Sequence, residues 1–437
     1  MKKILIVALS ILLCACSSNK TDEKTEVSTS GKNTSAQNLQ YLNLSEGFST
    51  EDGFYHMVMV DNEKGETRYN IRYFDYASKQ EVYLCDKPQC SHDNDSCTSY
   101  LPLGGLTSLF VSNNHLYLLK NPSMGNVVKA DGSIEKEQGN PSILYRMDID
   151  GKNKKILCKL EEGFEFESTV IALSEDTLYV VASKHDLIAM DENSSTEIKT
   201  DSFLYKINLE NGEKSTSQNM KDKFMVGAKQ NTILFQNLHY SQDLDELLKN
   251  KDYETYDRVS MQATTMYQTY DSKQNKLGKE FSTNEHYPTF DGDYVFYLTQ
   301  QNELCKQNIQ DGNVEVLTQL NSGYTYVLST EITDGYLVIE AWNNNAENEY
   351  VKSFVYSLEK DAVSEVTQLV KGTNEPLRIL GATKDNYFML YRKDGHMETT
   401  WAGTQQFETD KAYYGLISKS DFYNGLDTFE DVSSIDQ

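Results

Sequence analysis

The sequence lacks the short motifs by which many enzyme classes are recognised. Its 437 residues contain no Gly-x-Ser-x-Gly elbow, no His-Glu-x-x-His pair and no glycine-rich phosphate loop. These absences count against the hydrolases, metallopeptidases and nucleotide-binding enzymes that carry such motifs. Glycoside chemistry is not excluded in this way, because its paired carboxylates meet only in the folded protein.

Basic residues are scarce. The chain has 41 Lys and Arg against 66 Asp and Glu, a formal net charge of −25. Nucleic acids and anionic membrane surfaces attract clusters of Lys and Arg, so this balance argues against both as partners. The acidic residues are spread along the chain, which is typical of a solvated surface and leaves room for weak binding of basic ligands.

Long apolar runs are absent except at the N-terminus, where residues 4–13 are apolar. This run is short of the ~20 residues that span a bilayer. Two lysines precede it and small residues follow it, which is typical of an export signal. The sequence Leu13-Cys14-Ala15-Cys16 resembles the lipobox of bacterial lipoproteins. The resemblance implies a signal peptide over 1–15 and an acyl chain such as palmitate on Cys16; the alternative is an ordinary secretory signal.

The next segment has almost no apolar residues. Residues 17–37 are nearly all Ser, Thr, Lys, Asn, Asp, Glu and Gly. Such a segment cannot bury a core and stays flexible. We therefore expect a tether over residues 16–39 that connects a lipid anchor to a folded domain over 40–437.

Helical periodicity is almost absent from the folded domain. Its apolar residues form short β-branched and aromatic runs between Asn, Asp and Gly, which predicts strands and tight turns. A turn followed by an apolar strand recurs seven times, at 51–60, 113–119, 175–181, 230–235, 291–297, 334–339 and 384–391. A second strand and turn follow each copy, at 71–76, 143–151, 203–212, 266–271, 304–312, 354–359 and 414–419.

Two hairpins per repeat predict about four strands per repeat. Repeats of this kind are typical of an all-β fold, the β-propeller. We predict seven four-stranded blades, with residues 429–435 as an outer strand of the last one. The Tyr-x-x-Asp-x-Asp-Gly pattern resembles TolB-like and YWTD-type propeller repeats, which implies the same fold and no particular activity.

Five irregular stretches follow the second strands of their blades. We expect them on one face of the propeller, with one short helix that begins near Ser241; they cover 121–142, 184–202, 240–261, 342–352 and 392–411. Both tryptophans, Trp342 and Trp401, fall in these stretches. They are the predicted ligand-binding residues, for a protein, peptide or glycan. The alternative is that each tryptophan packs its own loop.

Three cysteines and a histidine occur within thirteen residues. They are Cys85, Cys90, His92 and Cys97, in the connection between the first and second predicted blades. Cys3His is a standard ligand set for structural zinc. The spacing Cys-x4-Cys-x-His-x4-Cys matches no common zinc finger, and a disulfide with one spare thiol is the alternative in an oxidising compartment. Two isolated residues, Cys158 and Cys305, are expected to be small buried hydrophobic side chains.

The cysteine segment carries a further resemblance. Together with Tyr73-Phe-Asp-Tyr76 before it and residues 414–425 near the end of the chain, it is similar to a group of uncharacterised clostridial lipoproteins. This resemblance implies a propeller that is lipid-anchored outside the cytoplasm of a Gram-positive gut anaerobe. It implies no reaction.

Three functions are compatible with these features. The anchor, the rigid ring and the one-sided loops favour a recognition or assembly module that binds an extracytoplasmic protein, peptide or glycan. A surface hydrolase acting on glycan or peptide is one alternative. A protein that captures metal through the cysteine loop is the other.

Overall fold

The computed structural model describes most of the predicted folded domain. The described residues are 38–61, 67–102, 105, 107–122, 126–128, 134–136, 141–189, 195–283, 288–343, 350–366, 369–373, 375–399 and 405–435. All of them belong to one compact unit, residues 36–437. The predicted signal peptide, Cys16, most of the predicted tether and Trp401 lie outside the described residues.

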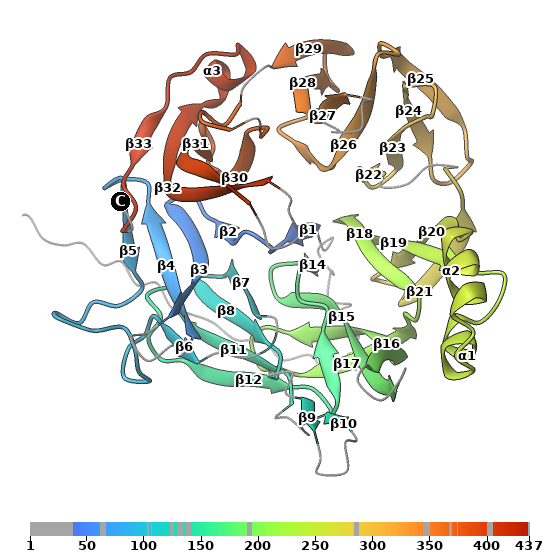
Figure 1. The fold of residues 1–437 in the computed structure, drawn as a ribbon, viewed down its shortest axis with the longest axis horizontal. Helices are drawn as coiled ribbons and strands as arrows, with labels where there is room; N and C mark the ends of the chain where they lie inside the picture. The colour runs from blue at the N-terminus through green and yellow to red at the C-terminus, as the bar shows by residue number, and fades with distance from the viewer. Residues whose placement is uncertain are drawn as a thin grey trace, which may run out of the picture. The chain divides into compact units, whose positions relative to one another are not determined.

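Short antiparallel sheets make up this part of the chain, and Figure 1 shows them following one another around a ring. We number the four-stranded units 1–7 in chain order. Unit 1 consists of β2 (Phe48–Ser49), β3 (Gly53–Asp61), β4 (Thr67–Asp75) and β5 (Gln80–Tyr83). Unit 2 consists of β7 (Thr107–Ser112), β8 (His115–Lys120), β11 (Ile143–Asp148) and β12 (Lys155–Lys159).

The next three units repeat this order of strands. Unit 3 consists of β14 (Val170–Leu173), β15 (Thr177–Ala189), β16 (Ser195–Asn208) and β17 (Lys214–Asn219). Unit 4 consists of β18 (Lys223–Gln230), β19 (Thr232–His239), β20 (Thr264–Asp271) and β21 (Lys276–Phe281). Unit 5 consists of β22 (Thr289–Phe290), β23 (Tyr294–Leu298), β24 (Glu303–Asn308) and β25 (Val314–Gln319).

The last two units complete the ring. Unit 6 consists of β26 (Tyr324–Thr333), β27 (Tyr336–Asn343), β28 (Tyr350–Ser357) and β29 (Ala362–Val366). Unit 7 consists of β30 (Arg378–Ala382), β31 (Asn386–Thr399), β32 (Gln405–Ser418) and β33 (Glu430–Val432). The predicted all-β propeller is confirmed, and β33 is the outer strand predicted within residues 429–435.

Each predicted pair of hairpins supplies the second and third strands of one unit. Besides β1, four described strands lie outside the units: β6 (Tyr100–Pro102), the pair β9 (Asn126–Val128) and β10 (Ile134–Lys136), and β13 (Phe164–Phe166).

The first strand, β1 (Leu39–Asn43), has an unusual place. It pairs with both β14 and β18, and Figure 1 shows it between these innermost strands of units 3 and 4. The two units, β1 and β13, which pairs with β15, therefore form one ten-stranded sheet. Because two units share a sheet, the predicted count of seven separate blades stays a prediction.

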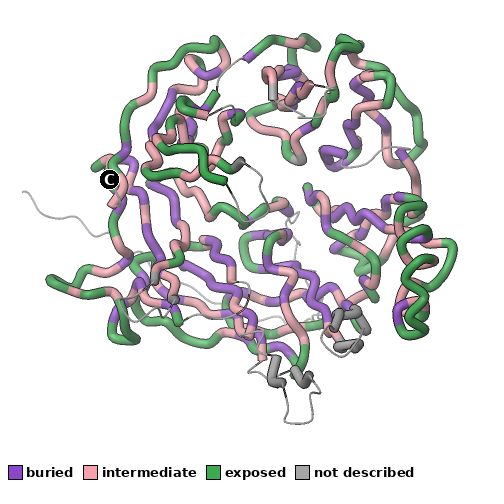
Figure 2. The backbone as a smooth tube through the Cα atoms, viewed as in Figure 1, coloured by how far each residue is buried: buried purple, intermediate pink, exposed green. Residues whose placement is uncertain are grey.

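Hydrophobic clusters lie between neighbouring units. Leu178 and Val180 of β15 pack against unit 2, whereas Tyr179 and Val181 of the same strand pack against unit 4. Successive side chains of a strand point to opposite faces of its sheet, so alternate residues of a middle strand pack against the unit before and the unit after. Figure 2 shows this burial concentrated in the middle strands of the units, while the outer strands are more exposed.

The ring is closed between units 7 and 1. Phe54 and Phe74 of unit 1 share a hydrophobic cluster with Phe388 and Leu416 of unit 7. After β33, the backbone continues alongside β5, where the N–H of Glu81 donates to the carbonyl of Ser433 at 2.7 Å. The end of the chain is thus fixed to the first unit by main-chain hydrogen bonds.

Two sequence expectations about the loops are wrong. The stretches 184–202 and 392–411 are largely continuous with the hairpins β15–β16 and β31–β32, rather than irregular. In the second stretch, the mainly polar residues 392–398 are mostly exposed and gave no strand signal, because the backbone of such a hairpin is satisfied in its own ladder without burying a face.

The number of helices also differs from the prediction of one short helix. Within the described ranges there are three: α1 (Leu244–Lys249), α2 (Tyr253–Met261) and α3 (Lys419–Tyr423). Asp243, not Ser241, caps α1, because its carboxylate accepts from the backbone N–H groups of Asp245 and Glu246. Asp252 then begins α2 in the same way, by accepting from the N–H of Thr255.

Candidate metal centre

The four predicted metal ligands lie in one loop, residues 84–99, between β5 and β6. These two strands pair with successive parts of one edge of β4. The loop therefore leaves the sheet and returns to it at Ile71. The carbonyl of Ile71 accepts from the N–H of Leu84 at 3.1 Å, and its N–H donates to the carbonyl of Ser99 at 2.8 Å. Both ends of the loop are fixed to the same residue of the sheet.

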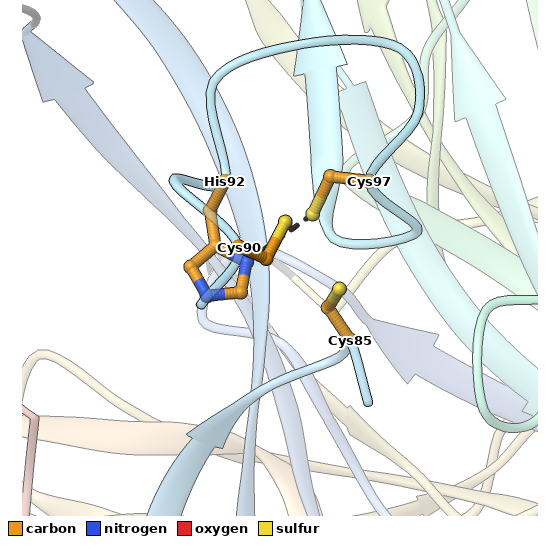
Figure 3. Close-up of side chains that lie close together, drawn as sticks. All are labelled: Cys85, Cys90, His92 and Cys97. Atoms are coloured by element: carbon orange, nitrogen blue, oxygen red, sulfur yellow. Dashed lines mark hydrogen bonds between the residues drawn. The ribbon is translucent and has the colours of Figure 1, made fainter. Parts of the chain in front are cut away.

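The ligand side chains converge inside this loop, as Figure 3 shows. The Sγ atoms of Cys85, Cys90 and Cys97 and a ring nitrogen of His92 all lie within 4.8 Å of one another. Tetrahedral zinc, with Zn–S near 2.3 Å and Zn–N near 2.0 Å, separates its ligand atoms by ~3.5–3.8 Å. The cluster is therefore close enough to hold a metal after contraction by about 1 Å or less. The three cysteines are free thiols, and Nδ1 of His92 lies 3.2 Å from Sγ of Cys97.

Two left-handed residues give the loop its shape. Gln89 and His92 have φ of 58° and 55°, values that L-residues adopt only when their surroundings hold them. The buried amide of Asn70 provides part of that support, because its Nδ2 donates to the carbonyl of His92 at 2.9 Å. Later in the loop, the hydroxyl of Thr98 donates to the carbonyl of Leu84 at 2.5 Å.

The imidazole of His92 is held flat against Tyr83. The two ring centroids are 3.9 Å apart and the planes are inclined by 12°. The guanidinium of Arg72 lies 5.1 Å from the centroid of Tyr83. Burial, together with the positive charges of Arg68 and Arg72, holds the pKa of His92 below its usual value. The neutral ring that results is the form that coordinates metals.

The thiols differ in acidity. Burial raises the pKa of Cys97 to about 12, and its thiol neighbours contribute to this rise. Burial also opposes the ionisation of Cys85, but hydrogen bonds from the N–H of Lys87 and from the thiols of Cys97 and Cys90 outweigh it. The pKa of Cys85 is therefore below that of an ordinary thiol. Since the thiolate is the metal-binding form, Cys85 is more readily available to a cation than Cys97.

The loop also contacts the next unit. Nζ of Lys152, from the turn between β11 and β12, lies 2.7 Å from the carboxylate of Asp86. Beside it, Gly151 has a φ of 82°, and a Cβ there would lie 3.1 Å from Leu84. The cysteine loop of unit 1 therefore packs on unit 2, in the connection between the first two units where the sequence placed it.

Of the other predicted site residues, only Trp342 is among the described residues, and it lies outside this cluster. Trp342 is half-buried near the end of β27 in unit 6, and Trp401 lies outside the described residues, as does Cys16. Cys158 on β12 and Cys305 on β24 are buried thiols in units 2 and 5, as the sequence predicted.

The sequence did not reveal the residues that support the cluster. Asn70 and Arg72 lie on β4 and Tyr83 ends β5, and each reads as part of an ordinary strand. Only the antiparallel register, which brings Arg72 opposite Tyr83, shows that they surround the loop. A polar residue at the strand position of Asn70, 1% exposed, is the one signal that could have been noticed.

No family model matches the chain. No curated protein matches it either. Among solved structures, the β-propeller domain of the Trilobed protease from Pyrococcus furiosus is 8% identical, with a TM-score of 0.42, and the match covers 87% of this chain and 98% of that one.

Two further solved structures are similar at the same level. Oligogalacturonate lyase from Vibrio parahaemolyticus is 10% identical, with a TM-score of 0.41 and coverage of 89% of this chain and 86% of that one. Pyrococcus horikoshii acylaminoacyl peptidase is 10% identical, with a TM-score of 0.45 and coverage of 86% and 57%. At these identities the comparisons assign no activity.

No helix among the described residues combines the length and the hydrophobicity that crossing a bilayer requires.

Proposed function

We propose that this protein is a lipid-anchored, extracytoplasmic binding module in which one zinc ion fixes a loop between the first two units of a β-propeller. The zinc ligands are Cys85, Cys90, His92 and Cys97. The single observation that carries the proposal is the convergence of their four ligand atoms to within 4.8 Å. The ion supplies a closed structural site, because all four positions of a tetrahedral zinc are taken by protein ligands.

The surroundings of the cluster support a structural role. Both ends of the loop are bonded to Ile71, and the imidazole is stacked on Tyr83. Ligands held by a fixed second layer of contacts are typical of sites built for a resident metal. The loop also contacts unit 2 through Lys152, so fixing it stabilises the boundary between two units.

The anchor at Cys16 and the extracytoplasmic location belong to the proposal because they rest on the N-terminal sequence alone. We also propose, from the sequence, that Trp342 and Trp401 contact a protein, peptide or glycan. A rigid ring on a flexible tether suits a module that presents loops to a partner.

Elemental analysis of the purified chain, combined with thiol counting, tests the zinc site. We expect about one zinc per chain, as in other Cys3His sites. Among the described residues, denaturation and removal of the ion should make five thiols reactive, three from the cluster and two from the buried Cys158 and Cys305. The variants Cys90→Ser and His92→Ala should lose the zinc. The matched variants Cys158→Ser and Cys305→Ser remove buried thiols outside the cluster and should retain it.

The alternatives give different results in the same experiment. Metal-free protein with a disulfide between two of the three loop cysteines would contradict the zinc proposal. Zinc that a mild chelator removes while the loop stays resistant to proteolysis would support metal capture instead. Turnover of glycans or peptides, abolished by a single carboxylate substitution, would favour the hydrolase alternative.

A further inference from the structure

A cavity of about 460 Å³ lies between units 6 and 7, far along the chain from the cysteine loop. Its walls include parts of β26, β27 and β28 of unit 6, of β30 of unit 7, Asn43 at the end of β1, and residues 45–47 after it. Cavities that bind small molecules are commonly ~300–1,000 Å³ in volume. This one is large enough for a ligand of the size of an amino acid.

One part of the cavity is apolar. Val338, Val355, Leu377, Ile379 and Phe422 contribute to its wall. Val355 and Phe422 belong to the hydrophobic cluster between units 6 and 7, with Val338, Leu377 and Ile379 packed against it. This part of the wall is therefore supported by the core and offers a preformed surface for an apolar group.

The carboxylate of Glu331 lies in the same cavity. Glu331 is accessible from the cavity, yet the surrounding protein desolvates its carboxylate and thereby raises its pKa. A hydrogen bond from the backbone N–H of Asn43 opposes this rise without cancelling it. Among the described residues, no lysine, arginine or histidine forms an ion pair with Glu331. An accessible but desolvated carboxylate without a cationic partner is a favourable place for a ligand's positive charge.

A second carboxylate, Glu340, has neighbours that partly offset the effect of its burial. Burial raises its pKa, while the neighbouring Trp342 and the positive charge of Arg378 favour its ionised form. With Glu46, the cavity is therefore lined by three glutamates and one arginine. This charge balance favours a cation over an anion, in agreement with the net charge of −25 for the whole chain.

We propose that this cavity binds a small primary amine with an apolar body, with the ammonium group on Glu331 and the body against the wall that includes Val338 and Leu377. The charge-assisted hydrogen bond supplies orientation, and burial of the apolar body supplies most of the binding free energy. This goes beyond the proposed zinc site, which lies between units 1 and 2, so either can fail without the other.

Isothermal titration calorimetry of the full chain with β-phenylethylamine tests this site. We expect saturable one-to-one binding that weakens about tenfold or more in Glu331→Gln, because the amide keeps the shape but loses the charge. The matched variant Glu359→Gln changes an exposed carboxylate in the turn between β28 and β29 and should bind like the original protein. N-acetyl-β-phenylethylamine has the same body without the charge and should not bind measurably.

The apolar wall provides a second, independent test. Leu377 lies outside the strands, and Leu377→Asn places a polar, uncharged amide in the apolar wall without removing Glu331. This variant should also lose binding, while its circular dichroism stays that of the original protein. Absence of saturable binding to the original protein, or equal affinity in a folded Glu331→Gln variant, would overturn the proposal.

Discussion

At the scale of single residues, the cysteine loop depends on polar contacts from the strands beneath it. Asn70 is the clearest case, because its side chain is 1% exposed and holds the carbonyl of a left-handed His92. A buried acceptor that loses its donor keeps the full cost of its desolvation. The loop therefore depends on a residue that is not itself a ligand.

We expect Asn70→Ala to lower the free energy of unfolding by about 1–3 kcal/mol, because the carbonyl of His92 loses its buried donor. Urea denaturation followed by circular dichroism measures this change. Asp95→Ala alters an exposed residue of the same loop and should change stability by less than about 0.5 kcal/mol. Equal stabilities of the two variants would show that the contact with His92 carries no energy.

A second case of a single residue with a structural role is Glu81, which lies where unit 7 meets unit 1. Glu81 accepts from the hydroxyl of Ser434 at 2.5 Å and from the N–H of Ile435 at 2.8 Å, and Nε2 of His56 lies 2.8 Å from its other oxygen. Burial alone would raise the pKa of Glu81, but His56, Ser434 and Ile435 together lower it from 4.5 to about 2. The ionised form is therefore favoured in the folded protein.

This shift predicts a pH dependence of stability. Because the folded pKa is depressed, the stabilisation is complete above the ordinary value of 4.5 and is lost as the pH falls towards 2. The difference corresponds to at most about 3 kcal/mol. Glu81→Gln should therefore lower the melting temperature at pH 7 and flatten its decline between pH 4.5 and 2. A decline as steep as that of the original protein would show that other carboxylates cause it.

At the scale of elements, β1 has the most unusual position. Gln40 pairs with Leu173 of β14 and with Lys229 of β18, so five residues connect two units that are neighbours in the ring. The segment then continues to Asn43, whose N–H donates to Glu331 in the proposed amine site. The N-terminal end of the described chain is thus part of the structure that forms this cavity.

We expect Gln40→Pro to destabilise the protein by about 3 kcal/mol or more, because proline removes a backbone donor from a strand paired on both sides. Hydrogen exchange should show faster exchange in β14 and β18 than in β32 of unit 7, whose hydrophobic clusters contain no residue of units 3 and 4. Asn38→Pro introduces proline at an exposed position before the strand and should leave exchange nearly unchanged. Uniform exchange in the Gln40→Pro variant would contradict the role of β1.

The elements also show what sequence patterns can predict. Runs such as Leu178 to Val181 were identified as strands because both faces of a middle strand are buried and apolar. The hairpin extension around Arg392 and Asp394 was not identified as strand, because its polar residues bury no face and only the backbone ladder defines it. The hairpins of the core were predictable, and those that extend beyond it were not.

At the scale of the whole molecule, the ring brings together residues that are distant in sequence. The four cysteine-loop ligands were predicted because they lie within thirteen residues of one another. The amine cavity was not, because Asn43, Glu331, Glu340 and Arg378 come from four different elements. A site within one loop leaves a sequence signal, whereas a site between units exists only after the ring closes.

Closure of the ring is also what gives the cysteine loop its setting. Unit 1 packs against unit 7 through Phe54 and Phe388, and against unit 2 through Tyr55 and Leu118. The loop is therefore attached to a unit that is supported on both sides. A zinc ion in the loop then adds local order to a frame that is already fixed.

X-ray absorption spectroscopy at the zinc edge of the purified chain tests the central claim most directly. We predict a first shell of three sulfur atoms at about 2.3 Å and one nitrogen atom at about 2.0 Å, since Cys85, Cys90, His92 and Cys97 are the four proposed ligands. His92→Ala should remove the nitrogen contribution if any zinc remains. A first shell of oxygen and nitrogen without sulfur, or a protein purified without zinc, would contradict the account.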